Sequence, residues 1–174
     1  MPHAIFPTAF GTCGLAWNET GLTGFQLPEA TAAETEQQLA ARAFTQAAAE
    51  PLPDWLPPLI ARVQAHCAGQ MQDFADVALD WSRVSDFQRA VYEQTVAIKA
   101  GYKRSYGDIA AALKLGPAAA RAVGTALGAN PWPLIVPCHR VVSASDKMTG
   151  FSGPGGVRTK TRLLALEGAE LLSE

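Results

Sequence analysis

Residues 105–128 read SYGDIAAALKLGPAAARAVGTALG, and this stretch decides the fold of the second half of the chain. Ser105 and Asp108 have the spacing of a capping box, which predicts a short helix directly after the serine. A tight turn follows, and Pro117 suits the first position of a second helix, which Gly128 would end. Two short helices joined by a turn that contains glycine are typical of a helix-turn-helix motif, although an ordinary helical hairpin gives the same pattern.

The second of these helices carries almost only small residues, namely Ala118, Ala119, Ala120, Ala122, Gly124 and Ala126. Arg121 is its one long side chain. A helix with such a face can approach the wall of a DNA groove closely, and a single projecting arginine could reach a base edge or enter the base stack. Small residues also occur where helices pack tightly, so this pattern leaves both interpretations open.

A thiol and an imidazole are adjacent downstream of the two helices. Residues 134–136 are apolar and expected to be extended, and residues 137–140 read PCHR. A cysteine is nucleophilic as its thiolate, and a neighbouring imidazole or cation lowers its pKa, so Cys138 is a candidate nucleophile. The alternative is a buried structural cysteine. Glu167 ends the last helix, where a carboxylate opposes the helix dipole, which suggests another purpose for it.

The first half predicts short strands and two helices without a chemical motif. The expected elements are strands at 5–10, 13–17 and 22–27, a helix from Thr31 to about Ala49, a proline-rich loop at 50–58, a helix that continues to Gly69, and one more candidate strand at 77–79. The second half adds a helix capped by Ser85 that ends near Gly101. We therefore predict an α+β fold, with a small N-terminal α/β scaffolding domain over residues 1–82. A mostly helical, winged-helix-like domain with a helix-turn-helix would occupy residues 83–174.

The charge is divided between these halves. The composition is that of a globular protein, and no apolar stretch is long enough to span a membrane. The whole chain has a net charge of −2. Residues 1–82 contain two basic and nine acidic side chains and carry −7, whereas residues 83–174 contain twelve basic and seven acidic side chains and carry +5. Such asymmetry indicates contact between the basic half and nucleic acid.

Three cysteines are too few to suggest a disulfide scaffold. The N-terminus lacks a basic region followed by an apolar stretch, so we expect no secretory signal and a cytoplasmic protein. His66 and Cys67 are neighbours on one predicted helix, and no ligand spacing supports zinc. We expect no metal and no cofactor.

Six ordered motifs resemble the O6-alkylguanine-DNA alkyltransferase (methylated-DNA–protein-cysteine methyltransferase) family. They lie at residues 87–92, 105–110, 119–124, 130–131, 137–142 and 163–168. The first 82 residues resemble the variable N-terminal domain of the family only loosely. The resemblance implies DNA repair by irreversible transfer of an alkyl group from guanine O6 in double-stranded DNA to a cysteine, with each molecule acting once. The range of alkyl groups and activity on O4-alkylthymine are left open.

The resemblance also assigns roles to individual residues. Cys138 would accept the alkyl group, His139 would remove the thiol proton through a water, and Glu167 would orient the imidazole. Asn130 would hold the turn before the cysteine together. The helix-turn-helix would enter the minor groove with the lesion base flipped out.

Two of the DNA-contacting residues have a specific expected task. Tyr106 would donate to N3 of the flipped guanine, and Arg121 would fill the vacated place in the stack. The other residues expected to contact the base or the DNA are Ser105, Thr125, Arg140, Val141, Phe151, Ser152 and Gly153. Phe151 stands where many members have tyrosine, and Pro154, Gly155 and Gly156 make this glycine-rich loop longer and stiffer than in some relatives.

Other functions remain possible on the sequence alone. A non-catalytic lesion-binding sensor of the alkyltransferase-like kind would lack the acceptor cysteine, and a thiol-sensing DNA-binding regulator does not account for Tyr106, Asn130 and Glu167 together. A cysteine hydrolase is weaker still, because His3 and His66 lie in the half without motifs. The chain has no long apolar heptad, so we expect a monomer.

Overall fold

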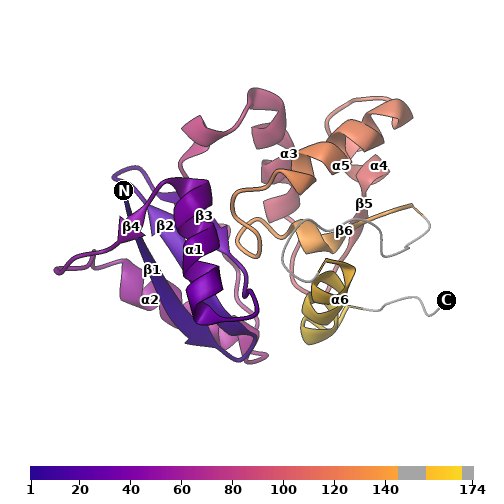
Figure 1. Cartoon of the computed structure of the whole chain (residues 1–174). Helices are drawn as coiled ribbons and strands as arrows, with labels where there is room; N and C mark the ends of the chain where they lie inside the picture. Colours follow the sequence, from indigo (N-terminus) through magenta and orange to yellow (C-terminus); the bar gives the residue numbers. More distant parts are fainter. Residues whose placement is uncertain (145–155, 170–174) are drawn as a thin grey trace. The chain divides into compact units, whose positions relative to one another are not determined.

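The computed structural model describes residues 1–144 and 156–169 and divides the chain into two compact units (Figure 1). The first unit comprises Met1–Gln72 and Asp76–Asp80, and the second comprises Asp73–Ala75 and Trp81–Glu174. Within the described ranges, no helix has the length and apolar character needed to cross a membrane. A domain boundary at residue 82 stays a prediction.

The first unit contains a four-stranded sheet in the order β3-β2-β1-β4. The strands are β1 (Pro2–Thr8), β2 (Gly11–Trp17), β3 (Leu22–Gln26) and the two-residue β4 (Gln46–Ala47). β1, β2 and β3 are antiparallel, whereas β4 pairs with β1 in parallel. Asn18 closes the β2–β3 turn, because its side-chain oxygen accepts from the backbone N–H groups of Thr20 and Gly21.

Two helices, α1 (Ala32–Ala43) and α2 (Leu56–Cys67), pack on this sheet. Successive side chains of a strand point to opposite faces. At β2, Gly14 lies against Leu39 of α1, and its neighbour Cys13 interacts with Cys67 of α2. The two helices therefore cover opposite faces, which explains why residues 13–17 of β2 are buried throughout.

Several local predictions in this unit differ from the structure. The first helix ends at Ala43 rather than Ala49, because Phe44 adopts a left-handed conformation (φ 54°) and the chain then pairs with β1 as β4. The proline-rich loop ends before Leu56, since the two prolines that follow lie in the first turn of α2, where their missing N–H groups are not needed. Residues 77–79 contribute one isolated bridge and no strand.

The second unit is mostly helical. Its helices are α3 (Asp86–Val96), α4 (Tyr106–Ala112), α5 (Ala120–Gly128) and α6 (Val157–Leu166), with 3₁₀ turns at Trp81–Arg83, Pro117–Ala119 and Cys138–Arg140. Capping boxes at Ser85 and Ser105 begin α3 and α4. α3 ends before the predicted Gly101, because the last turn tightens into a bond from Ile98 N–H to Thr95 C=O.

α4 and α5 form the predicted helix-turn-helix, and both pack against α3 (Figure 1). The Tyr92 hydroxyl of α3 donates to the Ala126 carbonyl of α5 over 2.6 Å, and its ring packs edge-on against the fully buried Trp132. Among the described residues, the strands of this unit are β5 (Arg104–Ser105) and β6 (Val141–Val142), which pair in parallel. The predicted α+β class is confirmed, and the winged-helix detail stays a prediction.

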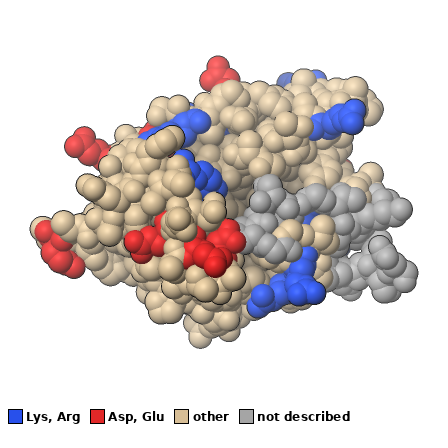
Figure 2. Space-filling view, viewed as in Figure 1, with Lys and Arg blue, Asp and Glu red and all other residues tan. Residues whose placement is uncertain are grey.

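Charge follows the division into units. On the face shown in Figure 2, acidic side chains gather over the first unit. Of the nine acidic residues before Arg83, all but Asp73 belong to that unit. The basic excess lies in the second unit, which also holds the helix-turn-helix and Cys138.

Candidate active site

Asn130 holds the loop that precedes the cysteine. Its side-chain amide donates to the Val136 carbonyl and its side-chain oxygen accepts from the Trp132 N–H, both over 2.9 Å. The Val136 N–H also reaches back to the Trp132 carbonyl over 2.8 Å, and Leu134 adopts a positive φ of 75°. Residues 134–136 are therefore a compact loop rather than the predicted extended run, because Asn130 closes the chain on itself.

The cysteine lies at the start of a 3₁₀ turn, Cys138–Arg140. The side chains of all three residues of this turn are buried. His139 Nε2 lies 2.9 Å from Glu167 Oε1, so the structure brings together the two groups expected to act as base and orienting residue. Glu167 follows directly after α6. Glu167 is buried, and its partners across the site, rather than its own helix, compensate the charge of this carboxylate.

Arg140 completes this cluster. Its guanidinium donates to both oxygens of Glu167, from Nε over 2.9 Å and from Nη2 over 2.7 Å, while Nη1 donates to the Ile98 carbonyl over 2.6 Å. A contact between Arg140 and DNA would have to displace these buried ionic hydrogen bonds, and the expected contact stays a prediction.

Burial raises the pKa of the Cys138 thiol above its ordinary value. A hydrogen bond with the Asn130 side chain and the positive charge of Lys160 act in the opposite direction without cancelling it. The expectation of a lowered pKa is therefore wrong for the free protein. At neutral pH the resting thiol carries its proton, which must leave when the sulfur reacts.

The other described residues that are expected to contact DNA lie on β5, α4, α5 and β6. Ser105 caps α4 with its hydroxyl, and Tyr106 occupies the first turn of that helix. Arg121 and Thr125 are exposed one turn apart on α5, and Val141 is buried in β6. Phe151, Ser152 and Gly153 lie outside the described residues.

Gly124 of α5 faces the ring of Tyr106 on α4. A Cβ at Gly124 would lie 3.8 Å from the Tyr106 ring, which is ordinary contact distance. The small-residue face of α5 thus serves in part to pack the neighbouring helix, as the second interpretation of that pattern requires.

Sequence reasoning missed Lys160, which is 1% exposed and whose charge acts on Cys138. The signal was present. Lys160, Leu163, Leu164 and Glu167 follow the i, i+3, i+4, i+7 spacing of one helical face, and extending the stripe back from Glu167 would have placed the lysine on the buried side.

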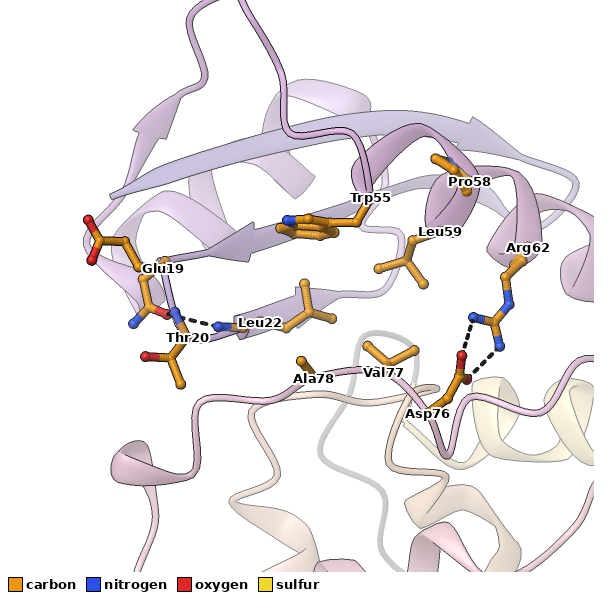
Figure 3. Close-up of a pocket in the computed structure, with 12 residues that line it drawn as sticks. Glu19, Thr20, Leu22, Trp55, Pro58, Leu59, Arg62, Asp76, Val77 and Ala78 are labelled. Carbon is orange, nitrogen blue, oxygen red and sulfur yellow. Dashed lines mark hydrogen bonds and ion pairs between the residues drawn. The ribbon is translucent and has the colours of Figure 1, made fainter.

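The first unit holds a separate pocket of about 500 Å³ that contains none of these residues (Figure 3). It lies between the β2–β3 turn, α2 and residues 76–78. Trp55 lies along one side of it, and an ion pair of 2.9 Å between Arg62 and Asp76 lies at one end. The residues that line this pocket include no cysteine and no histidine, and none of the residues expected to take part in the reaction lies in it.

The comparisons with known proteins agree with this site. Residues 86–169 match the family described as "6-O-methylguanine DNA methyltransferase, DNA binding domain". The methylated-DNA–protein-cysteine methyltransferase of Mycobacterium tuberculosis is 47% identical over 108 residues, which are 62% of each chain. The protein of that name from Mycobacterium leprae is 39% identical over 68% of this chain and 73% of its own.

A solved structure extends the likeness over both units. The crystal structure of Mycobacterium tuberculosis OGT in complex with DNA is 34% identical and covers 97% of this chain and 93% of its own, with a TM-score of 0.77. The alignment with the Mycobacterium tuberculosis sequence spans less than two thirds of that relative's length, whereas the structural match spans nearly all of it. The chain belongs to the methylated-DNA–protein-cysteine methyltransferase family.

Proposed function

We propose that this protein repairs DNA by taking an alkyl group from O6 of guanine onto Cys138, once per molecule. The observation that carries the proposal is the buried cluster in which Cys138 precedes His139, whose Nε2 is 2.9 Å from the Glu167 carboxylate. A nucleophile, a base and a group that orients the base are the parts that nucleophilic catalysis needs. Membership of the methyltransferase family supports the same chemistry.

The reaction balances without a cofactor. The thiol proton passes through a water to His139, and Glu167 stabilises the imidazolium that forms. The sulfur then attacks the alkyl carbon as the carbon–O6 bond breaks. Guanine takes the electron pair of that bond and is reprotonated on the ring. The product is a thioether, which water does not reverse, so the protein is consumed with its substrate.

The helix-turn-helix supplies the proposed DNA contact, in the minor groove. Arg121 and Thr125 are exposed on α5, and the small residues around them allow a close approach to the groove. Arg121 enters the stack as the lesion base flips out, Tyr106 donates to N3 of that base, and the backbone near Val141 contacts its edge. The protein acts as a monomer in the cytoplasm. Sedimentation analysis with and without duplex DNA tests its oligomeric state.

Intact and peptide mass spectrometry after incubation with a duplex that contains O6-methylguanine tests the function. The expected result is one methyl group per protein, confined to the peptide with Cys138. Cys138→Ser is the matched control, which keeps the fold and the DNA face and gains no methyl group. A folded wild-type protein that binds the duplex and stays unmodified would instead be a lesion sensor.

A further inference from the structure

The pocket of the first unit has an aromatic wall (Figure 3). Its twelve lining residues all belong to that unit. The indole of Trp55 forms one side and Val77 and Ala78 form the opposite side, with the buried side chains of Leu22 and Leu59 between them. A volume of about 500 Å³ lies within the range of sites that bind small ligands or single side chains.

Trp55 presents its ring to this pocket in a fixed position. The side chain is 43% exposed, and its ring packs edge-on against that of the buried Trp17, with 5.8 Å between the ring centres. A partly exposed tryptophan is typical of binding surfaces, and its face is the best of the aromatic side chains for contact with a cation. Because Trp17 holds the indole, a ligand would not have to order it.

The rim of the pocket is acidic. Glu19 is exposed near one end, and Asp76, whose side chain is 71% exposed, pairs with Arg62 over 2.9 Å at the other. Asp54, the residue before Trp55, is exposed as well. The first unit as a whole contains eight acidic and two basic side chains and carries −6. This distribution of charge attracts a cation and repels an anion.

The N-terminus of α2 borders the pocket without offering an anion site. A helix N-terminus binds anions through its free N–H groups. Two of the first three residues of α2 are Pro57 and Pro58, which have none, and the N–H groups of Leu56 and Leu59 donate to preceding backbone carbonyls. The helix therefore does not counteract the preference of the rim for a cation.

A second pocket, of about 600 Å³, adjoins the first. Four residues line both, namely Asn18, Glu19, Thr20 and Trp55. The other residues of the second pocket are apolar, namely Met1, Pro2, Trp17 and Pro53. An aromatic pocket with an acidic rim, next to an apolar pocket, suits two neighbouring residues of a polypeptide better than one small molecule. The two pockets together are called the Trp55 groove below.

We propose that the Trp55 groove binds an arginine-containing segment of another protein. The guanidinium stacks on the Trp55 ring between Glu19 and Asp76, and an apolar residue next to the arginine lies in the second pocket. Arginine fits better than lysine, because its guanidinium is planar and stacks on aromatic faces. This inference goes beyond the proposed function, since none of the residues expected to react lies in the groove.

NMR titration of the Trp55 indole N–H with the peptide acetyl-Arg-Leu-amide tests the proposal. The peptide should shift this signal saturably, with a dissociation constant in the millimolar range. Acetyl-citrulline-Leu-amide has a side chain of nearly the same shape without the charge, and it should bind about tenfold more weakly. Acetyl-Lys-Leu-amide and acetyl-Arg-Gly-amide should also bind more weakly, because the first lacks the planar cation and the second lacks the apolar neighbour.

Two variants locate the binding. Trp55→Leu removes the aromatic face and Glu19→Gln removes a charge of the rim, and each should weaken binding of the arginine peptide by about two- to fivefold. The backbone N–H of Gly21, which lines the groove, reports binding in the Trp55 variant. Glu34→Gln is the matched control, because it removes the same charge from an exposed position on α1, and it should bind as the wild type does.

An unshifted Trp55 signal, or equal binding of the arginine and citrulline peptides, would overturn the proposal. Equal binding of acetyl-Arg-Leu-amide and acetyl-Arg-Gly-amide would assign the pocket to a free guanidinium compound. A Trp55 shift on raising the protein concentration alone would assign it to a second copy of the chain, and either result would overturn a protein partner. If Trp55→Leu does not fold, the peptide series in wild type and Glu19→Gln decides.

Discussion

Cys13 and Cys138 are both free and buried, yet their surroundings differ in kind. Cys13 lies inside the first unit between β2 and α2, where its polar neighbours are the Cys67 thiol and the Thr8 hydroxyl. Cys138 lies in the second unit beside an amide, an ammonium and a hydrogen-bonded imidazole. Burial alone therefore does not identify a nucleophilic cysteine. A nucleophilic cysteine is identified by neighbouring polar groups that can stabilise the charge of its thiolate, accept its proton and replace water around the sulfur.

The largest expected effect is the loss of alkyl transfer in Cys138→Ser, since a serine hydroxyl has no accessible anion at neutral pH. Cys13→Ser, with the same atomic change at an equally buried site, should transfer the benzyl group of O6-benzylguanine at close to the wild-type rate. It should instead cost about 1–3 kcal/mol of unfolding free energy, because a hydroxyl costs more to remove from water than the thiol it replaces at this fully buried position. Single-turnover kinetics and urea unfolding measure the two effects. A Cys13→Ser variant that folds but does not take up the benzyl group would contradict the view that only Cys138 is the acceptor.

Glu167→Gln should give the next largest effect. The amide cannot stabilise an imidazolium at His139, so alkyl transfer should slow about 100-fold. It also leaves the guanidinium of Arg140 buried without its counter-ion, which should lower the unfolding free energy by about 3–5 kcal/mol.

Glu93→Gln is the matched control for that change. Glu93 pairs with Arg89 over 2.7 Å on the exposed face of α3, with both side chains half exposed. Its loss should cost at most about 0.5 kcal/mol and leave the rate unchanged. Equal losses of stability in the two variants would show that the Glu167 cluster contributes no more than a surface ion pair.

Asn130→Ala should have a smaller effect. The substitution leaves the buried Trp132 N–H without the Asn130 oxygen, at about 1–3 kcal/mol, whereas the Val136 carbonyl still accepts from the Cys138 N–H over 2.7 Å. It also removes a hydrogen bond that lowers the pKa of Cys138. Alkylation of this thiol by iodoacetamide should therefore begin at higher pH than in the wild type.

Asn18→Ala gives the comparison for Asn130 in the first unit. Asn18 likewise closes a turn through its side-chain oxygen, and its amide donates to Asp80 over 2.7 Å. This variant should lose stability and leave the reactivity of Cys138 untouched. A shift of thiol reactivity in Asn18→Ala and none in Asn130→Ala would contradict the role given to the loop.

The sequence predicts those parts of the second unit that depend on residues close together in the chain. The serines that begin α3 and α4 cap them as predicted, and Pro117 and Gly128 limit the second part of the helix-turn-helix. The loop before Cys138 was not predictable in this way, because a positive φ at Leu134 carries no marker in a leucine. The ion pair between Arg140 and Glu167 joins residues 27 positions apart, and their adjacency depends on how α6 packs.

The pH dependence of stability is the smallest expected effect, and its direction follows from the raised pKa of Cys138. Below about pH 8.5 the thiol is protonated in the folded and the unfolded chain, and its contribution to stability is fully present. Above that pH the unfolded chain ionises first, so stability should fall by at most about 1.4 kcal/mol per pH unit until the folded thiol ionises too. Urea unfolding of wild type and Cys138→Ala from pH 7 to 10 isolates this contribution.

The Ala variant should lose less stability than the wild type over that range, because it has no thiol to ionise at this position. Cys13 also has a raised pKa, because its neighbour Cys67 and, next to it, burial disfavour its thiolate. The contribution of Cys13 to the pH dependence of stability remains in the Cys138→Ala variant. It appears there as the loss of unfolding free energy that persists at alkaline pH. Identical pH profiles for wild type and Cys138→Ala would mean that the Cys138 thiol ionises as easily in the folded chain as in water. The groups around Cys138 would then offset its burial completely, and the contrast with Cys13 would be larger than the raised pKa indicates.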